Sequence, residues 1–129
     1  MNITFFDDPL EGPNAPDDVR VKQIGLFIHE DGRRVMVGFE LTKFRERPSI
    51  EVIITNAKGI LASSLSVIET LTPNFSLTMH LRDKEPTDSY HVKVIVYYAT
   101  PETERQNVHS CEATFNITQP GEHIFPCEA

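Results

Sequence analysis

From Val19 onward, apolar residues recur at every second position, and this period of two constrains the fold more than any other feature of the sequence. Side chains of a β-strand point alternately to two faces, so the pattern is typical of strands with one face buried. The clearest runs are Val35–Leu41, Phe75–Leu81 and Tyr90–Tyr98. No helical pattern of useful length, with apolar residues three and four positions apart, competes with it. The chain is therefore predicted to be all-β.

Seven strands are expected within about 100 residues, which is typical of an antiparallel β-sandwich. Their expected ranges are Val19–His29, Val35–Leu41, Ile50–Ile54, Leu61–Val67, Phe75–Leu81, Tyr90–Tyr98 and Val108–Ile117. A change of parity between Val21 and Ile24 predicts a β-bulge in the first strand. Leu61, Leu65 and Val67 mark the weakest strand, with serines on or near its exposed side.

The 129 residues suit one domain, and the charge divides them into three parts. Residues 1–18 carry five of the acidic side chains and no basic one, and we interpret them as an acidic, proline-containing N-terminal arm. Residues 19–118 hold equal numbers of acidic and basic side chains and form the predicted sandwich. Residues 119–129 are expected to be a C-terminal tail. The net charge of −7 argues against nucleic acid as a partner, because binding to the phosphate backbone requires clustered Lys and Arg.

No stretch of the sequence has the roughly 18 to 20 apolar residues that cross a bilayer. The first residues lack the basic and long apolar regions of a secretory signal. Either the protein is cytoplasmic or a leader has been removed, and the simpler expectation is a cytoplasmic protein without a membrane partner.

The segment Asp88–Val94 resembles the tyrosine corner of immunoglobulin-like and fibronectin type III-like domains. In that motif a Tyr at the start of the penultimate strand donates its hydroxyl to upstream backbone, a role that the resemblance gives to Tyr90. The resemblance covers residues 19–118 and concerns the fold alone, because the chain has no Trp and lacks the intersheet cysteine pair of antibody-type domains. It implies an immunoglobulin-like topology, with a C2-like or jelly-roll sandwich as the alternative. Function does not follow from such a fold.

Two of the expected strands are apolar on both faces, which predicts a binding surface. In an immunoglobulin-like topology the third and sixth strands are neighbours, so their outward residues should form an apolar patch with a charged rim. The expected interface consists of Ile53, Ile95, Tyr97, Glu51 and Lys93. The patch would serve a homodimer or a protein partner. The alternative is that an end of the same chain covers it, and the apolar candidates are Ile3, Phe5, Phe6, Ile124 and Phe125.

Two imidazoles and two thiols form a weaker candidate, a zinc site made of His109, Cys111, His123 and Cys127. One alternative is that Cys111 is a small strand residue and Cys127 a free thiol in the tail. The other is a Cys111–Cys127 disulfide, which a cytosolic location would disfavour. Acidic clusters such as Asp83–Asp88 suggest calcium, although solvated turns explain them equally well. We expect no bound metal or cofactor.

A nucleophile elbow, a zinc-protease helix motif and a phosphate-binding glycine loop are all absent from the sequence. The chain is therefore expected to be a non-catalytic interaction or accessory domain. The alternative is a metal-binding or small-ligand-binding sandwich.

Overall fold

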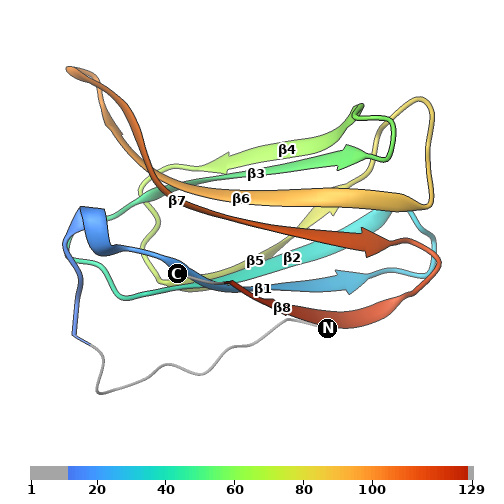
Figure 1. The fold of residues 1–129 in the computed structure, drawn as a ribbon, viewed down its shortest axis with the longest axis horizontal. Helices are drawn as coiled ribbons and strands as arrows, with labels where there is room; N and C mark the ends of the chain where they lie inside the picture. Colours follow the sequence, from blue (N-terminus) through green and yellow to red (C-terminus); the bar gives the residue numbers. More distant parts are fainter. Residues whose placement is uncertain (1–11, 128–129) are drawn as a thin grey trace.

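The computed structural model describes residues 12–127 and shows two antiparallel sheets of four strands each, packed face to face. Sheet A has the strand order β5-β2-β1-β8, and sheet B has the order β4-β3-β6-β7. The strands are β1 (Val21–Ile28), β2 (Arg34–Leu41), β3 (Ser49–Asn56), β4 (Leu61–Val67), β5 (Asn74–His80), β6 (Ser89–Thr100), β7 (Thr103–Asn116) and β8 (Gly121–Pro126). Figure 1 shows sheet A below sheet B. The predicted antiparallel β-sandwich is therefore confirmed, with eight strands in place of seven.

The core lies between the two sheets and consists of the inward set of each alternating run. Val35, Val37 and Phe39 of β2 are 0% exposed, as are Val92, Val94 and Val96 of β6. Burying a Val or Phe side chain stabilises the fold by about 1.5 to 3 kcal/mol, so this alternation fixes the face that each strand turns inward. The structure confirms β3 and β6 as neighbours. It also confirms the bulge in β1, where the pairing with β2 shifts between Val21 and Gln23.

The boundary expected at residue 118 is wrong, because β8 continues the sandwich to Pro126. Ile124 of β8 pairs with Gly25 of β1, and the backbone N–H of Cys127 donates to the carbonyl of Lys22 over 2.8 Å. The segment was interpreted as a tail because it is short and its alternation is weak. Its side chains are only half-buried or exposed, and β8 is the edge strand of sheet A.

Within the described part of the expected N-terminal arm, the chain forms a short 3₁₀ turn, η1 (Pro16–Asp18). Asn14 is attached to the β2–β3 connection: its backbone N–H donates to the carbonyl of Lys43 over 2.8 Å, and the N–H of Arg45 donates to the carbonyl of Asn14. Ile3, Phe5 and Phe6 lie outside the described residues. No helix in the described range 12–127 is long and apolar enough to cross a membrane.

Candidate functional site

The five residues of the predicted interface lie together on the outer face of sheet B. Glu51 and Ile53 belong to β3, and Lys93, Ile95 and Tyr97 belong to β6. Glu51 pairs directly with Ile95, and Ile53 pairs with Lys93, so these four side chains share one face in two adjacent rows.

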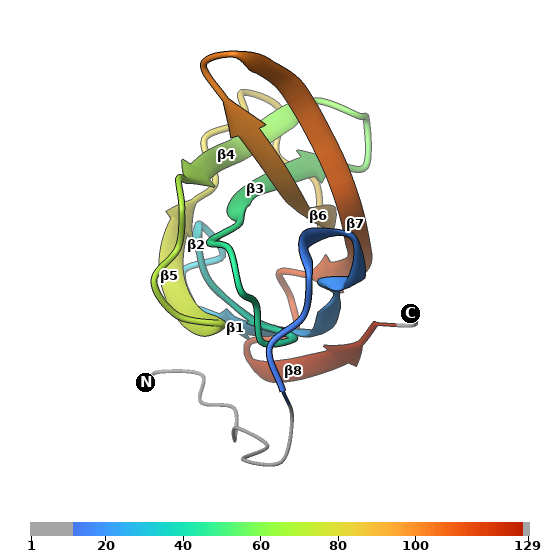
Figure 2. The same ribbon diagram turned by 90° about the vertical axis from the view of Figure 1, so that its left-hand side faces the viewer.

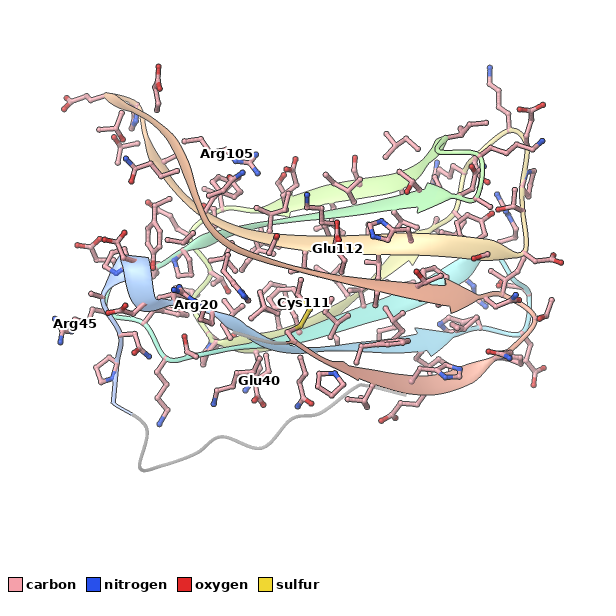
Figure 3. All side chains as sticks on the ribbon, in the orientation of Figure 1. Arg20, Glu40, Arg45, Arg105, Cys111 and Glu112 are labelled. Atoms are coloured by element: carbon pink, nitrogen blue, oxygen red, sulfur yellow. A yellow bond between two sulfur atoms is a disulfide. The ribbon has the colours of Figure 1, made fainter. Side chains whose placement is uncertain are left out.

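The expected open apolar patch is nevertheless closed by polar side chains of the same sheet. Ile95 and Tyr97 are each only 7% exposed. The guanidinium of Arg105 lies 4.0 Å from the centre of the Tyr97 ring, and its Nη2 donates to Oε1 of Glu51 over 2.8 Å. Figure 3 shows Arg105 near the twisted end of the β6–β7 hairpin. The sequence did not indicate this contact, because the expected strands end at Tyr98 and resume at Val108, whereas β6 extends to Thr100 and β7 begins at Thr103.

β8 does not cover this patch, although two of its residues were candidate covers. Ile124 and Phe125 pair with β1 in sheet A, on the opposite side of the molecule from the outer face of sheet B. The other three candidates, Ile3, Phe5 and Phe6, lie outside the described residues.

We expect the Arg105→Ala substitution to expose the Tyr97 ring and create the apolar patch that the sequence predicted. The stability loss should be small, about 1 kcal/mol, because cation–π contacts and ion pairs near the surface contribute little each. Sedimentation velocity as a function of concentration should show stronger self-association than in the parent. Lys58→Ala, at the opposite end of the sandwich, is the matched control. Unchanged sedimentation would contradict the prediction that Arg105 keeps this face from self-association.

The four candidate zinc ligands do not form a donor set, because Cys111 and Cys127 form a disulfide with Cα atoms 5.8 Å apart. The interpretation of Cys127 as a free thiol is therefore wrong. The disulfide joins β7 of sheet B to the residue that follows β8 of sheet A, so it closes one side of the sandwich. His109 accepts a hydrogen bond from the N–H of Val21 at Nδ1 over 2.9 Å, while Nε2 of His123 lies 2.9 Å from the carbonyl oxygen of Gln119. Both imidazoles thus make protein contacts.

The acidic cluster considered for calcium contains a structural carboxylate. The Asp83 side chain is fully buried and accepts hydrogen bonds from the Tyr90 hydroxyl (2.9 Å), Asn56 Nδ2 (2.9 Å) and Arg33 Nη2 (3.3 Å). Burial alone would raise the pKa of Asp83, but the hydrogen bonds from Asn56, Tyr90 and Arg33 outweigh it and lower the pKa. Tyr90 therefore donates its hydroxyl to an upstream side chain, whereas the resemblance to the tyrosine corner implies an upstream backbone acceptor. Among residues 12–127, no group of three potential metal ligands comes together.

An apolar surface that the sequence did not reveal lies at one end of the sandwich, on the β4–β5 connection. Ile68 and Leu71 are 67% and 77% exposed, the highest values for large apolar side chains in the described chain. They border an open hollow of about 640 Å³ with Arg47, Val67 and Phe75. Ile68 and Leu71 lie outside any alternating run, so the period of two gave no sign of them. We call Ile68, Leu71 and this hollow the apolar end.

A second hollow of about 310 Å³ lies beside it and shares Arg47 and Glu69. Glu69 has a positive φ of 50°, the only non-glycine residue of the described chain with one, and its N–H donates to Oγ of Ser49. Such a conformation is costly for a side chain larger than Gly and is concentrated at functional positions. Tyr98 lines this second, more polar hollow. Burial, and to a lesser extent the charge of Glu46, raise the pKa of Tyr98 to about 12. An apolar and a polar compartment therefore meet at Glu69.

Comparison with known proteins identified the fold and no family. No protein-family model matches the chain, and no curated protein matches its sequence. Among solved structures, a β-glucuronidase from Bifidobacterium dentium matches 79% of this chain with a TM-score of 0.51 and 14% identity. A β-glucuronidase from Ruminococcus gnavus matches 78% with a TM-score of 0.50 and 14% identity. The matched part is 18% and 16% of those enzymes, so the chain spans less than a fifth of either.

Proposed function

We propose that this chain is a non-catalytic accessory or interaction domain that binds a protein partner through the apolar end. The observation that carries the proposal is the exposure of Ile68 and Leu71, three positions apart beside a hollow large enough to receive a side chain. Apolar anchors of this kind, surrounded by polar groups, are the usual centre of a protein interface. On the outer face of sheet B, the surface first expected from the sequence, the Tyr97 ring is covered by Arg105, which donates to Glu51.

The comparisons support an accessory role. In both β-glucuronidases a sandwich of this kind is a minor part of a much longer chain. The order of β1 to β7 also agrees with an immunoglobulin-like or fibronectin type III-like arrangement, with β8 as an addition. Domains of this fold serve many functions, so the partner must be identified from the surface itself.

The disulfide bears on the compartment in which the domain acts. Disulfides persist in oxidising compartments and are rare in the cytosol. We therefore propose an oxidising environment for this domain, in place of the cytoplasmic location expected from the sequence.

Site-specific photo-crosslinking tests the docking surface. A photoreactive side chain at Leu71 should give a crosslink to a partner, or to a second copy of this chain, in cells of the source organism. The same group at Lys58, exposed at the opposite end of the sandwich, is the control. The crosslinked partner, once purified, should bind the Ile68→Ser/Leu71→Ser variant at least about tenfold more weakly by calorimetry, because two buried anchors contribute more than about 1.4 kcal/mol.

Two outcomes would contradict the proposal. One is an equal crosslinking yield at positions 71 and 58. The other is a partner that binds the double variant as tightly as the parent, while circular dichroism shows that both are folded.

A further inference from the structure

The edge strand β4 lacks the features that normally protect the edge of a sheet. Among residues 12–127 it pairs with β3 alone, and Figure 2 shows it with β5 along one side of the sandwich. β4 contains no charged residue and no proline, whereas β7, at the other edge of sheet B, carries Glu104, Arg105 and Glu112. Natural proteins place charged side chains or proline on an exposed edge, because its unpaired backbone groups recruit another strand. The edge of β4 is therefore suited to pairing with a further strand.

The pairing of β4 with β3 determines which of its backbone groups face this edge. The carbonyl of Pro48, just before β3, accepts from the N–H of Thr70 beyond the end of β4. The direction of the backbone groups alternates along a strand, so the even-numbered residues of β3 bond toward β4. Their partners in β4 are the odd-numbered residues from 63 to 67. Ser64 and Ser66 therefore direct their N–H and C=O groups to the open edge.

The open part of this edge is complementary to a second copy of itself. The carbonyl of Ala62 accepts from the N–H of Arg82 over 2.9 Å, so the chain after β5 occupies the edge at the start of β4. The part that remains is centred on Leu65, with a serine on each side. When a second β4 is placed antiparallel about a two-fold axis at Leu65, Ser64 of each copy lies opposite Ser66 of the other. Each of these two pairs can exchange both of its N–H···O bonds, because all the groups involved face the edge.

Exposed apolar side chains lie at both ends of β4, and the same two-fold axis brings them together. Leu61, the first residue of β4, is 56% exposed, and Ile68, directly after its last residue, is 67% exposed. Antiparallel pairing about Leu65 places the start of one β4 beside the end of the other, so Leu61 of each copy comes next to Ile68 of its partner. Removal of these apolar side chains from water favours association, and the contact occurs twice in a two-fold dimer.

We propose that two copies of this chain associate through β4, whose edges pair antiparallel about Leu65 and join the two sheets B into one continuous sheet. The occupant of the edge is a second copy, because the outward backbone groups and the exposed apolar side chains both meet their own counterparts under one two-fold rotation. The inference rests on the proposed function, since it names the partner that meets Ile68, and it extends the contact from the apolar end to the β4 edge.

Sedimentation equilibrium of the full chain over a range of concentrations tests the pairing. Salt of about 0.15 M screens the repulsion between two chains that each carry a charge of −7. The parent should show a monomer–dimer equilibrium. Ser66→Pro removes an outward N–H that the dimer uses twice, and it should weaken the dimer at least about tenfold. Leu61→Lys, outside the apolar end, should also weaken the dimer, because it places a charge in each apolar contact.

Thr78→Pro on β5, the edge strand of sheet A, is the matched control and should leave the dimer unchanged. The carbonyl of Pro73 accepts from the N–H of Leu41 in β2, so by the same alternation the N–H of Thr78 faces the open edge of β5. The two proline substitutions therefore make the same change at the two neighbouring edges.

Hydrogen exchange of the parent tests the same pairing without a substitution. Exchange at the N–H groups of Ser64 and Ser66 should slow as the concentration rises through the dissociation constant, because pairing protects them. Exchange at Leu65, whose N–H faces β3 within each copy, should change much less.

A parent that stays monomeric at every concentration would overturn the inference, and the crosslink at Leu71 would still test the proposed function separately. A dimer that weakens with Ile68→Ser/Leu71→Ser but not with Ser66→Pro would also overturn it, because the apolar ends would then meet without pairing of the β4 edges. So would a dimer that responds to Thr78→Pro alone, which would place the contact on β5. Circular dichroism of each variant establishes that the sandwich is intact.

Discussion

Asp83→Ala should be the most damaging single substitution on a polar residue in this protein, with an expected loss of about 3 to 5 kcal/mol in the free energy of unfolding. The carboxylate accepts from two buried groups: the Tyr90 hydroxyl and one N–H of Asn56 Nδ2, which also donates to the carbonyl of Glu85. Each donor left without a partner costs about 1 to 3 kcal/mol. Arg33 adds less, because its partly exposed side chain can turn to water. Urea denaturation monitored by circular dichroism measures the loss.

Two matched variants separate the contributions to this network. Tyr90→Phe removes one donor and should cost about 1 to 2 kcal/mol, since the carboxylate keeps its other partners. Asp83→Asn retains the size and one acceptor oxygen, so its loss should lie between those of Tyr90→Phe and Asp83→Ala. A loss below about 1 kcal/mol for Asp83→Ala would contradict the assigned role.

The same network predicts a dependence of stability on pH. The pKa of Asp83 is lowered in the folded protein from its ordinary value of 3.8, so the unfolded chain binds the proton more tightly. The stabilisation is therefore complete above that value and is lost as the pH falls through the folded pKa. Asp83→Ala should consequently show a flatter fall of unfolding free energy than the parent below about pH 4.

The sequence predicted those parts of the fold that depend on burial alone. The alternation in β2, β3 and β6 identified their inward faces, because exchanging the two faces would put several Val and Ile side chains into water. It did not identify the inward residue at the start of β4. There the pairing with β3 shifts between Ile54 and Thr55, so Ala62 is buried and Leu61 is 56% exposed. A bulge of this kind depends on the partner strand, which local periodicity does not describe.

The candidate sites were harder to predict, because they depend on contacts between distant parts of the chain. Glu51 and Arg105 are 54 positions apart, and their ion pair decides whether Tyr97 is exposed. The alternation places Tyr97 on the outward face of its strand but gives no position for Arg105, which lies between two of the expected strands. The disulfide was left open among three alternatives, because the spacing of two cysteines does not show whether their Cα atoms approach each other.

Removal of the disulfide by Cys111→Ala/Cys127→Ala should lower the free energy of unfolding by about 3 kcal/mol. The two cysteines are 16 positions apart, and closing a loop of that size restricts the unfolded chain by about this amount. The loss should be greatest near β8, which among residues 12–127 is paired with β1 alone and has no fully buried side chain. Hydrogen exchange should therefore be faster at Ile124 and Phe125 than in the parent, with little change in β3 and β6.

Reduction of the parent with a phosphine gives the control for this prediction, because it breaks the bond without changing the sequence. The reduced parent should match the double variant in both unfolding free energy and exchange at β8, whereas the reductant should leave the variant unaffected. Exchange at β8 that is the same in the oxidised and reduced parent would show that pairing with β1 holds this strand unaided. In that case the disulfide would not determine how firmly sheets A and B are joined at this side of the sandwich.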